Sequence, residues 1–173
     1  GSNHLSTRST LCSIPGPAQF PHPAASHMLK TETGLTAALY VASLGLKVFP
    51  LRPGAKIPRI TGWQAKATTA EGQIRQWWTE STDANVGYST DDLTVVDLDP
   101  RNSGDKTWAA LEGVDHNPDT LTIKSAQGGR HYVFRNPPGV KVRSRAHALG
   151  IGVDVKGAGG LAVGPGSTWF GLE

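Results

Sequence analysis

Two aspartates stand one residue apart at the end of an apolar stretch, "LTVVDLDPRN", at residues 93–102. On a strand, residues i and i+2 share a face, so Asp97 and Asp99 project side by side while Val96 and Leu98 point into a core. Two adjacent carboxylates repel each other unless a positive group lies between them. Their oxygens suit a hard cation such as Mg²⁺ or Mn²⁺. The pair alone leaves open the alternative of a solvent-exposed strand end, where Asp99 and the following proline begin a turn.

A third carboxylate stands in a similar setting further along the chain. Asp154 lies in "GIGVDVKG", on a short apolar stretch between Val153 and Val155. Three acids on apolar strands, each followed by a turn or glycines, are typical of a two-metal site, which stabilises both the attacking and the leaving oxygen of an in-line displacement. The competing interpretation is a plain salt bridge between Asp154 and Lys156, two positions later on the same face.

Between these acidic strands lies "SAQGGRHYVF", residues 125–134. Its double glycine, which ends at Gly129, lets backbone N–H groups approach a ligand closely. Arg130 and His131 alternate across the following strand, so without a bulge or twist they cannot both face one ligand. We expect His131, on the face that it shares with Val133, to point toward the metal site. The alternative is a histidine that only makes structural hydrogen bonds.

Alternating helices and strands must position these residues. Apolar residues at helical spacing predict helices over 32–44 and 68–81, and a shorter one follows at 103–113. In the second helix Trp77 and Trp78 are expected to pack in the core rather than stack on a base. Strands are expected at 46–51, 85–89, 93–99, 120–125, 131–135, 152–157 and 160–165.

Hairpins are prominent in this pattern of strands. The segment 126–129 has the length and glycines of a tight hairpin connection. The last two strands are expected to pair with each other around residues 157–160. The sum is a mixed α/β domain whose sheets are at least partly antiparallel.

Composition sets limits on the class of protein. Residues 1–27 contain no Asp or Glu and show no apolar period, and they resemble an expression leader that we expect to be disordered, which leaves residues 28–173 as the domain. Without Arg8 the domain carries 16 basic and 14 acidic residues, a balance that permits a nucleic-acid partner without arguing for one. Cys12 lies in the leader, so disulfide frameworks and zinc ribbons are excluded. No stretch reaches the length of a membrane helix, and a cytoplasmic location is expected.

The motifs together resemble a known family. "VVDLDP", "GGRHYVF" and "GVDVKGAGGLAVGPGS" are similar, in this order, to the three motifs of the archaeo-eukaryotic primase superfamily, and specifically to the bifunctional DNA primase/polymerase domain of phage and plasmid replication proteins. Three upstream segments, "GLKVFPLRPGAKIPRITGW", "TTAEGQIRQWW" and "DANVGYST", resemble that family too. The resemblance covers about residues 33–170. A single motif is weak evidence, whereas six in the right order are specific.

The resemblance implies a fold and a set of site residues. The fold would be α+β, with largely antiparallel sheets, an RRM-like half, flanking helices and an active site in the cleft between the halves. Metal-binding roles fall on Asp97, Asp99 and Asp154, and a catalytic, nucleotide-contacting role falls on His131. Nucleotide- or template-binding roles fall on Lys56, Asn85, Gly129, Arg130, Lys156 and Ser167. The chain has "GPGS" at 164–167 where relatives often have Pro-Pro-Ser, which puts the placement of Ser167 in doubt.

The implied activity is template-directed nucleotidyl transfer with two Mg²⁺ or Mn²⁺ ions, a single-stranded DNA template or primer, and NTP or dNTP. The chain is expected to be a fragment of a longer replication protein with a helicase domain downstream. Two alternatives stay open. One is a non-catalytic module that binds nucleotide or single-stranded DNA. The other is a phosphohydrolase of the haloacid dehalogenase type, although such enzymes place their DxD strand near the N-terminus and follow it with Thr or Val.

Overall fold

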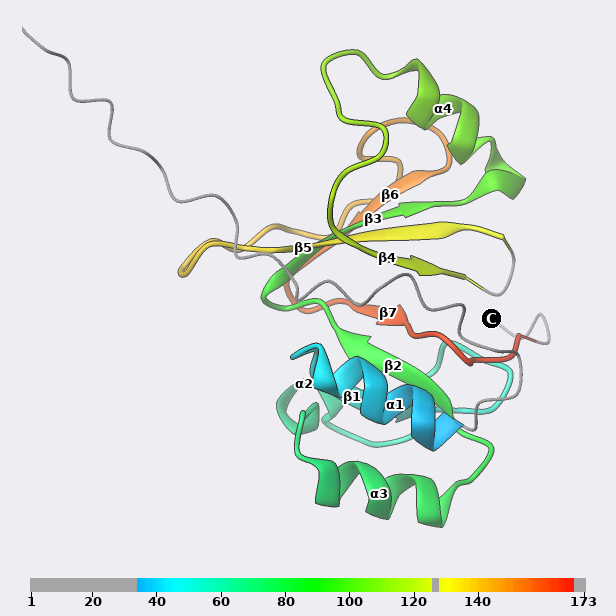
Figure 1. Ribbon diagram of the computed structural model, residues 1–173, viewed down its shortest axis with the longest axis vertical. Coiled ribbons are helices and arrows are strands. Elements are labelled where there is room, and N and C mark those ends of the chain that lie inside the picture. The colour runs from blue at the N-terminus through cyan, green and yellow to red at the C-terminus, as the bar shows by residue number, and fades with distance from the viewer. Residues whose placement is uncertain (1–33, 126–127, 170–173) are drawn as a thin grey trace, which may run out of the picture.

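The computed structural model describes residues 34–125 and 128–169, which form two antiparallel sheets with helices on their outer faces (Figure 1). The helices are α1 (Gly34–Ser43), α2 (Trp63–Lys66), α3 (Glu71–Glu80), the 3₁₀ turn η1 (Pro100–Asn102) and α4 (Gly104–Ala110). The strands are β1 (Val48–Leu51), β2 (Asn85–Ser89), β3 (Leu93–Leu98), β4 (Leu121–Lys124), β5 (Arg130–Arg135), β6 (Val153–Lys156) and β7 (Leu161–Val163).

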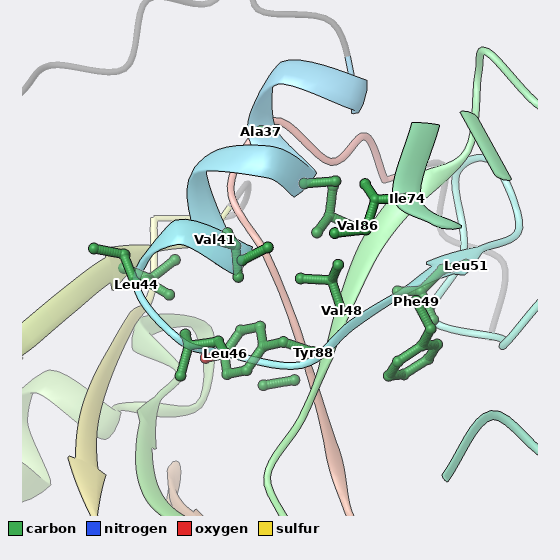
Figure 2. Close-up of a cluster of buried hydrophobic side chains, with 14 of the residues drawn as sticks. Ala37, Val41, Leu44, Leu46, Val48, Phe49, Leu51, Ile74, Val86 and Tyr88 are labelled. Atoms are coloured by element: carbon green, nitrogen blue, oxygen red, sulfur yellow. The ribbon is translucent and has the colours of Figure 1, made fainter. Parts of the chain in front are cut away.

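The three-stranded sheet has the order β1-β2-β7 and occupies one half of the molecule with α1 and α3 (Figure 1). Its strand β1 is buried along its whole length, because α1 and α3 pack against it and Phe49 stacks on Trp63 of α2, with ring centroids 4.4 Å apart. Trp77 and Trp78 of α3 are buried in this core, so the prediction that they pack inside the protein is confirmed. Figure 2 shows the aliphatic cluster between α1 and the sheet, which includes Val41, Val48 and Val86.

The four-stranded sheet has the order β4-β5-β3-β6, which puts β3 between β5 and β6. Strict alternation along β3 sends its side chains to two different cores. Val95 packs in the large core between the sheets. Val96 and Leu98 face the other way and form a smaller core with Trp108 of α4. The expectation that these two residues are buried behind the aspartates is therefore confirmed.

The predicted α+β class with largely antiparallel sheets is confirmed, because every pairing between the named strands is antiparallel. The hairpin between β4 and β5 forms as predicted, with Lys124 opposite Arg130. Residues 126–127 of its connection and the expected leader lie outside the described residues. So do the first two positions, 32 and 33, of the predicted first helix.

The prediction that residues 152–157 and 160–165 pair with each other is wrong. β6 pairs with β3, whereas β7 pairs with β2 in the other sheet. The connection between them is anchored by Thr90, whose hydroxyl donates to the Gly157 carbonyl at 2.7 Å and whose N–H donates to the Gly160 carbonyl at 3.0 Å. These bonds carry the chain from one sheet to the other, so two strands that are close in sequence do not meet.

Candidate active site

The centre of the candidate site is Asp97, on the central strand of the four-stranded sheet. Antiparallel pairing sets it opposite His131 on β5 and opposite Asp154 on β6. Residues that lie directly opposite in an antiparallel pair share a face, so the three side chains project from the same side of the sheet. The register thus brings together three residues that the sequence separates by 34 and 23 positions (97 to 131, 131 to 154).

Asp97 is held between two nitrogen donors. Its Oδ1 lies 3.4 Å from His131 Nε2, and its Oδ2 lies 3.0 Å from Lys156 Nζ. Burial by itself would raise the pKa of Asp97, but the hydrogen bond and charge of His131, together with Lys156, outweigh burial and hold the pKa well below its ordinary value. Asp97 is therefore ionised at neutral pH. Lys156 pairs with Asp97 rather than with Asp154, the partner considered from the sequence.

Asp99 lies just past the end of β3, at the start of the 3₁₀ turn. Its Oδ1 accepts the N–H and the Nε–H of Arg101, both at 3.0 Å. Its Oδ2 accepts Arg101 Nη2 and Asn102 Nδ2, both at 2.9 Å. The Arg101 hydrogen bonds outweigh burial and hold the pKa of Asp99 below its ordinary value. Asp99 thus caps a turn, as the alternative from the sequence held, and it also lines the pocket described below.

Asp154 is the most exposed of the three acids, with 37% of its side chain accessible. Its Oδ1 accepts the backbone N–H of His147 at 2.8 Å and lies 3.8 Å from His147 Nδ1. His147 belongs to the loop that precedes β6, and its backbone has a positive φ of 51°. The loop is turned so that a backbone donor meets the carboxylate.

The donor set can be tested against a divalent cation. Carboxylate oxygens are the ligands that Mg²⁺ and Mn²⁺ prefer, and Asp97, Asp99 and Asp154 line one pocket, so the chemistry of the set fits. Within residues 34–125 and 128–169, however, no group of three or more His, Cys, Asp or Glu side chains is arranged around one ion position. Each carboxylate instead bonds to protein donors, among them Lys156 and Arg101. Protein cations thus neutralise Asp97 and Asp99 in this arrangement, whereas Asp154 accepts a backbone N–H.

The pocket has a volume of about 220 Å³. Its walls come from both sheets, from the segment after β3, from the loop before β6 and from the segment after β7. The acids, His131 and Lys156 form one part of the wall. The rest of the lining is Ala55, Lys56, Asn85, Leu98, Arg101, Asn102, Ser125, His147, Gly152, Leu161, Ala162, Val163, Gly164, Ser167, Thr168 and Trp169.

Asn85 ties two walls of the pocket together. Its Nδ2 donates to the Thr168 carbonyl at 2.6 Å and to the Ala55 carbonyl at 3.3 Å, and its Oδ1 accepts the Thr168 N–H at 2.8 Å. Ser167 Oγ accepts the N–H of Val86 at 3.0 Å. Backbone groups thus bond to both the oxygen and the nitrogen of the buried Asn85 amide. Through these bonds Asn85 positions the segments at Ala55 and Thr168.

Lys56 and Trp169 meet where those segments come together. The Lys56 ammonium lies 4.9 Å from the centroid of the Trp169 ring, within the range of a cation–π contact. Both residues line the pocket. The sequence singled out Lys56 through its "GAKIP" segment, whereas Trp169 carries no signal of its own in the sequence.

Arg130 and Gly129 do not line the pocket. Arg130 is exposed and alternates with His131 along β5, so it faces the opposite side of the sheet. Gly129 donates its N–H to Ser125 Oγ at 3.0 Å. A Cβ at this position would lie 2.5 Å from the Leu98 carbonyl oxygen, so the glycine allows close approach of two strands. Its role in the described structure is packing.

Besides Thr168 and Trp169, sequence reasoning missed other residues that contact the predicted ones, among them Arg101, Asn102, His147 and Tyr88. Arg101 and Asn102 directly follow the Asp-Pro turn, so a capping pattern could have identified them. His147 and Tyr88 contact Asp154 and His131 only through the tertiary fold. Local spacing holds no signal for either.

The fold and this pocket define an α+β domain whose site presents carboxylates, a histidine and cationic side chains. The family model of the bifunctional DNA primase/polymerase N-terminal domain, Prim-Pol, matches residues 37–171, and the chain belongs to this family. Membership implies a nucleotidyltransferase type of enzyme that acts on DNA and nucleotides, in a family that generally uses divalent metals. No curated protein matches the chain significantly. Among the described helices, none is long and apolar enough to cross a membrane.

Proposed function

We propose that this domain is a template-directed nucleotidyltransferase that adds NTP or dNTP to a 3′-hydroxyl and releases pyrophosphate, in the replication of a phage or plasmid. The observation that carries the proposal is the register of three strands, which aligns His131, Asp97 and Asp154 on one face at the wall of a pocket. The domain would act in the cytoplasm of the host cell, where its substrates, DNA and nucleotides, are found.

The three aspartates would hold the divalent cations. When bound, a pair of Mg²⁺ or Mn²⁺ ions supplies charge neutralisation at the α-phosphate and activation of the attacking hydroxyl. Asp97 and Asp99 both have lowered pKa values, so both are ionised and ready to act as ligands at neutral pH. Lys156 and Arg101 hold these carboxylates in place of a cation in the present arrangement.

The cationic residues of the wall would bind the triphosphate. His131 Nε2, which faces Asp97, is a donor for a phosphate oxygen. Lys156 and Arg101 become available to phosphate once the carboxylates that they neutralise take other partners. Catalysis of this kind rests on positioning and electrostatic stabilisation, and it asks for little covalent chemistry from the protein.

The single-stranded template or primer would lie along the segment before the His147 loop. Arg145 exchanges two backbone hydrogen bonds with Val155, 2.8 and 3.0 Å long, which sets this segment beside Asp154. Arg143 and Arg145 are both exposed, and neither pairs with a carboxylate of the described residues. Two unpaired guanidinium groups next to the acidic strand support a contact with the sugar-phosphate backbone.

Primer extension on single-stranded DNA, with Mg²⁺ and Mn²⁺ compared, tests the proposal. We expect the chain to extend a primer and Asp97→Ala to lower the rate at least about a hundredfold, because a carboxylate that holds the metal is lost. The matched control is Asp83→Ala, which removes a carboxylate from an exposed turn outside the pocket. We expect its rate to stay within about twofold of the unsubstituted chain.

Two results would separate this proposal from its alternative. Normal extension by Asp97→Ala would contradict the assigned role of the acids. Absence of extension, together with tight binding of nucleotide and single-stranded DNA, would instead favour a non-catalytic binding module. A helicase domain on the same polypeptide, and synthesis without a primer, remain predictions that a longer chain would test.

A further inference from the structure

The pocket has two sides of different chemistry. The acidic residues of its lining, with His131 and Lys156, come from the four-stranded sheet and from the segment that follows β3. The described lining residues of the other side, from the three-stranded sheet and the segments next to it, include no carboxylate. That side presents Ala55, the residues of β7 and the indole of Trp169. A nucleotide is divided in the same way, because its triphosphate is a polyanion and its base is a flat ring with two π faces.

Trp169 sits on a segment that is fixed to the three-stranded sheet. Its neighbour Thr168 bonds to the buried amide of Asn85 through both its carbonyl, at 2.6 Å, and its N–H, at 2.8 Å. One residue earlier, Ser167 Oγ accepts the N–H of Val86 at 3.0 Å. The backbone that leads to the half-buried indole is therefore held in place, and an aromatic group that is already ordered loses little freedom when a ligand binds.

Lys56 lies over the ring of Trp169. Its ammonium is 4.9 Å from the ring centroid, and no carboxylate of the described residues pairs with it. The Asn85 amide that binds Thr168 also donates to the Ala55 carbonyl at 3.3 Å, so one side chain positions the residues that precede both Lys56 and Trp169. The contact between the cation and the ring thus fixes the orientation of the indole at the pocket.

We propose that Trp169 forms the base-binding part of the pocket, where its indole stacks on the base of the incoming nucleotide while Lys56 holds the ring from one face. The inference rests on the proposed function for the nature of the ligand. It divides the nucleotide between the two sides of the pocket, with the triphosphate at the acids and their cations and the base at Trp169. Lys56 is in this arrangement a positioning residue, since it acts through the indole.

Stacking on an indole has a consequence for selectivity. A π face contacts the plane of a base and does not read its hydrogen-bonding edge, so all four bases can occupy such a site. Stacking strength still differs, because the two fused rings of a purine cover more of the indole than the single ring of a pyrimidine. We therefore expect dATP to bind more tightly than dTTP, and this difference to vanish when the indole is removed.

Calorimetric titration in Mg²⁺, without DNA, tests the base site apart from any synthesis. The three probes are dATP, dTTP and inorganic triphosphate, which has the phosphates and no base. We expect Trp169→Leu to raise the Kd for dATP about tenfold, the usual range for a lost base–aromatic stack, and to leave the Kd for inorganic triphosphate unchanged. Trp169→Phe keeps a ring and should restore most of the affinity for dATP.

Lys56→Met tests the positioning role, because it removes the charge and keeps the length of the side chain. We expect a smaller rise in the Kd for dATP, roughly threefold, since the indole remains but loses the contact that orients it. The Kd for inorganic triphosphate should not change. If it rose as much as the Kd for dATP, Lys56 would be a phosphate ligand and its positioning role would be wrong.

Trp63→Leu is the matched control for Trp169→Leu. Trp63 is also half-buried, but its ring stacks on Phe49 with centroids 4.4 Å apart, and it is not among the residues that line the pocket. The control loses the same group from the same half of the molecule, so a general effect of losing an indole is common to both variants. We expect Trp63→Leu to bind all three probes as the unsubstituted chain does.

The outcomes separate this inference from the proposed function. Unchanged binding of dATP by Trp169→Leu, or an equal loss for dATP and inorganic triphosphate, would overturn the base site even if the chain extends primers normally. A selective loss of dATP in Trp169→Leu would support the base site even if the unsubstituted chain extends no primer, and in that case only the proposed nucleotidyl transfer would fail.

Discussion

At the scale of single residues, the site is a set of acids that already have partners. Asp97 bonds to His131 and Lys156, and Asp99 bonds to Arg101. Neighbouring positive groups stabilise the ionised form of such partly buried carboxylates. In the proposed reaction the same cations would bind the triphosphate. Lys156 and Arg101 would therefore stabilise the acids before the nucleotide binds and the phosphates afterwards.

Asp97→Asn tests the linkage between this ion pairing and stability. Because the pKa of Asp97 is lowered on folding, its contribution to stability is complete above the ordinary aspartate pKa of about 4 and is lost as pH falls through the lowered value. Between about pH 5 and pH 2, we expect the free energy of unfolding to fall more steeply for the unsubstituted chain than for Asp97→Asn. The difference in free energy of unfolding between the two proteins should therefore shrink by at least about 1 kcal/mol over this range. Urea unfolding at a series of pH values measures both.

The control for that experiment is Asp83→Asn, which removes a carboxylate from an exposed turn. Parallel pH curves for the unsubstituted chain and Asp97→Asn would show that Asp97 does not gain its stabilising partners on folding. Such a result would also remove the basis for expecting Asp97 to be ionised in the pocket.

At the scale of elements, α4 is fixed against the strand ends that carry the acids. Gly104, its first residue, is buried, and a Cβ there would lie 2.2 Å from the Gly152 carbonyl oxygen and 2.8 Å from the backbone N and O of Asp99. These contacts are all with backbone, which cannot rotate away as a side chain can. The absence of a side chain at Gly104 thus lets the helix, the segment after β3 and the start of β6 meet.

Gly104→Ala should therefore destabilise the fold by roughly 1–3 kcal/mol, the usual cost of overpacking, and should lower activity by displacing Asp99. Gly72→Ala is the matched control, because Gly72 lies in α3 and a Cβ there meets nothing within 4 Å. Alanine favours a helix, so we expect this control to leave stability unchanged or raise it by up to about 1 kcal/mol. Chemical denaturation of both variants makes the comparison. Equal changes in the free energy of unfolding of the two variants would show that the backbone around Gly104 shifts to accommodate a methyl group at little cost.

Element-level prediction succeeded where a local pattern decides the structure. The alternation in "LTVVDLD" correctly separated Asp97 from Val96 and Leu98, since side chains on a strand alternate between faces. Prediction of strand pairing failed for β6 and β7, which are neighbours in sequence but belong to different sheets. Hydrogen bonds from Thr90 hold their connection, and no local pattern encodes a contact across 67 residues.

At the scale of the whole molecule, the pocket lies where two sheets and several loops converge. The aligned acids come from the four-stranded sheet, whereas Asn85 and the segment with Ser167 and Trp169 belong to the other half. Asn85 binds that segment to the loop at Ala55. The site therefore depends on both sheets being in place together.

Binding of single-stranded DNA tests the charge distribution at this scale. The double variant Arg143→Ala/Arg145→Ala should weaken binding and flatten the dependence of log K on log salt by roughly 1.4, at about 0.7 for each phosphate contact that is lost. Fluorescence anisotropy of a labelled oligonucleotide, at salt concentrations from about 50 to 200 mM, measures the slope.

The charge-matched control is Lys66→Ala/Arg75→Ala, which removes two exposed cations from α2 and α3 in the other half. We expect its salt slope to equal that of the unsubstituted chain. If both double variants flatten the slope equally, net charge rather than the segment beside β6 attracts DNA, and the proposed path of the strand is wrong.

The sequence by itself determined the class of fold, the faces of the strands and the candidate residues, because alternation and helical spacing are local properties. The order of its motifs also pointed to the Prim-Pol family. Only the tertiary structure decided that Lys156 binds Asp97, that His147 reaches Asp154 and that Tyr88 reaches His131. These contacts follow from strand register and sheet packing, which join residues far apart in the chain and so leave no trace in local spacing.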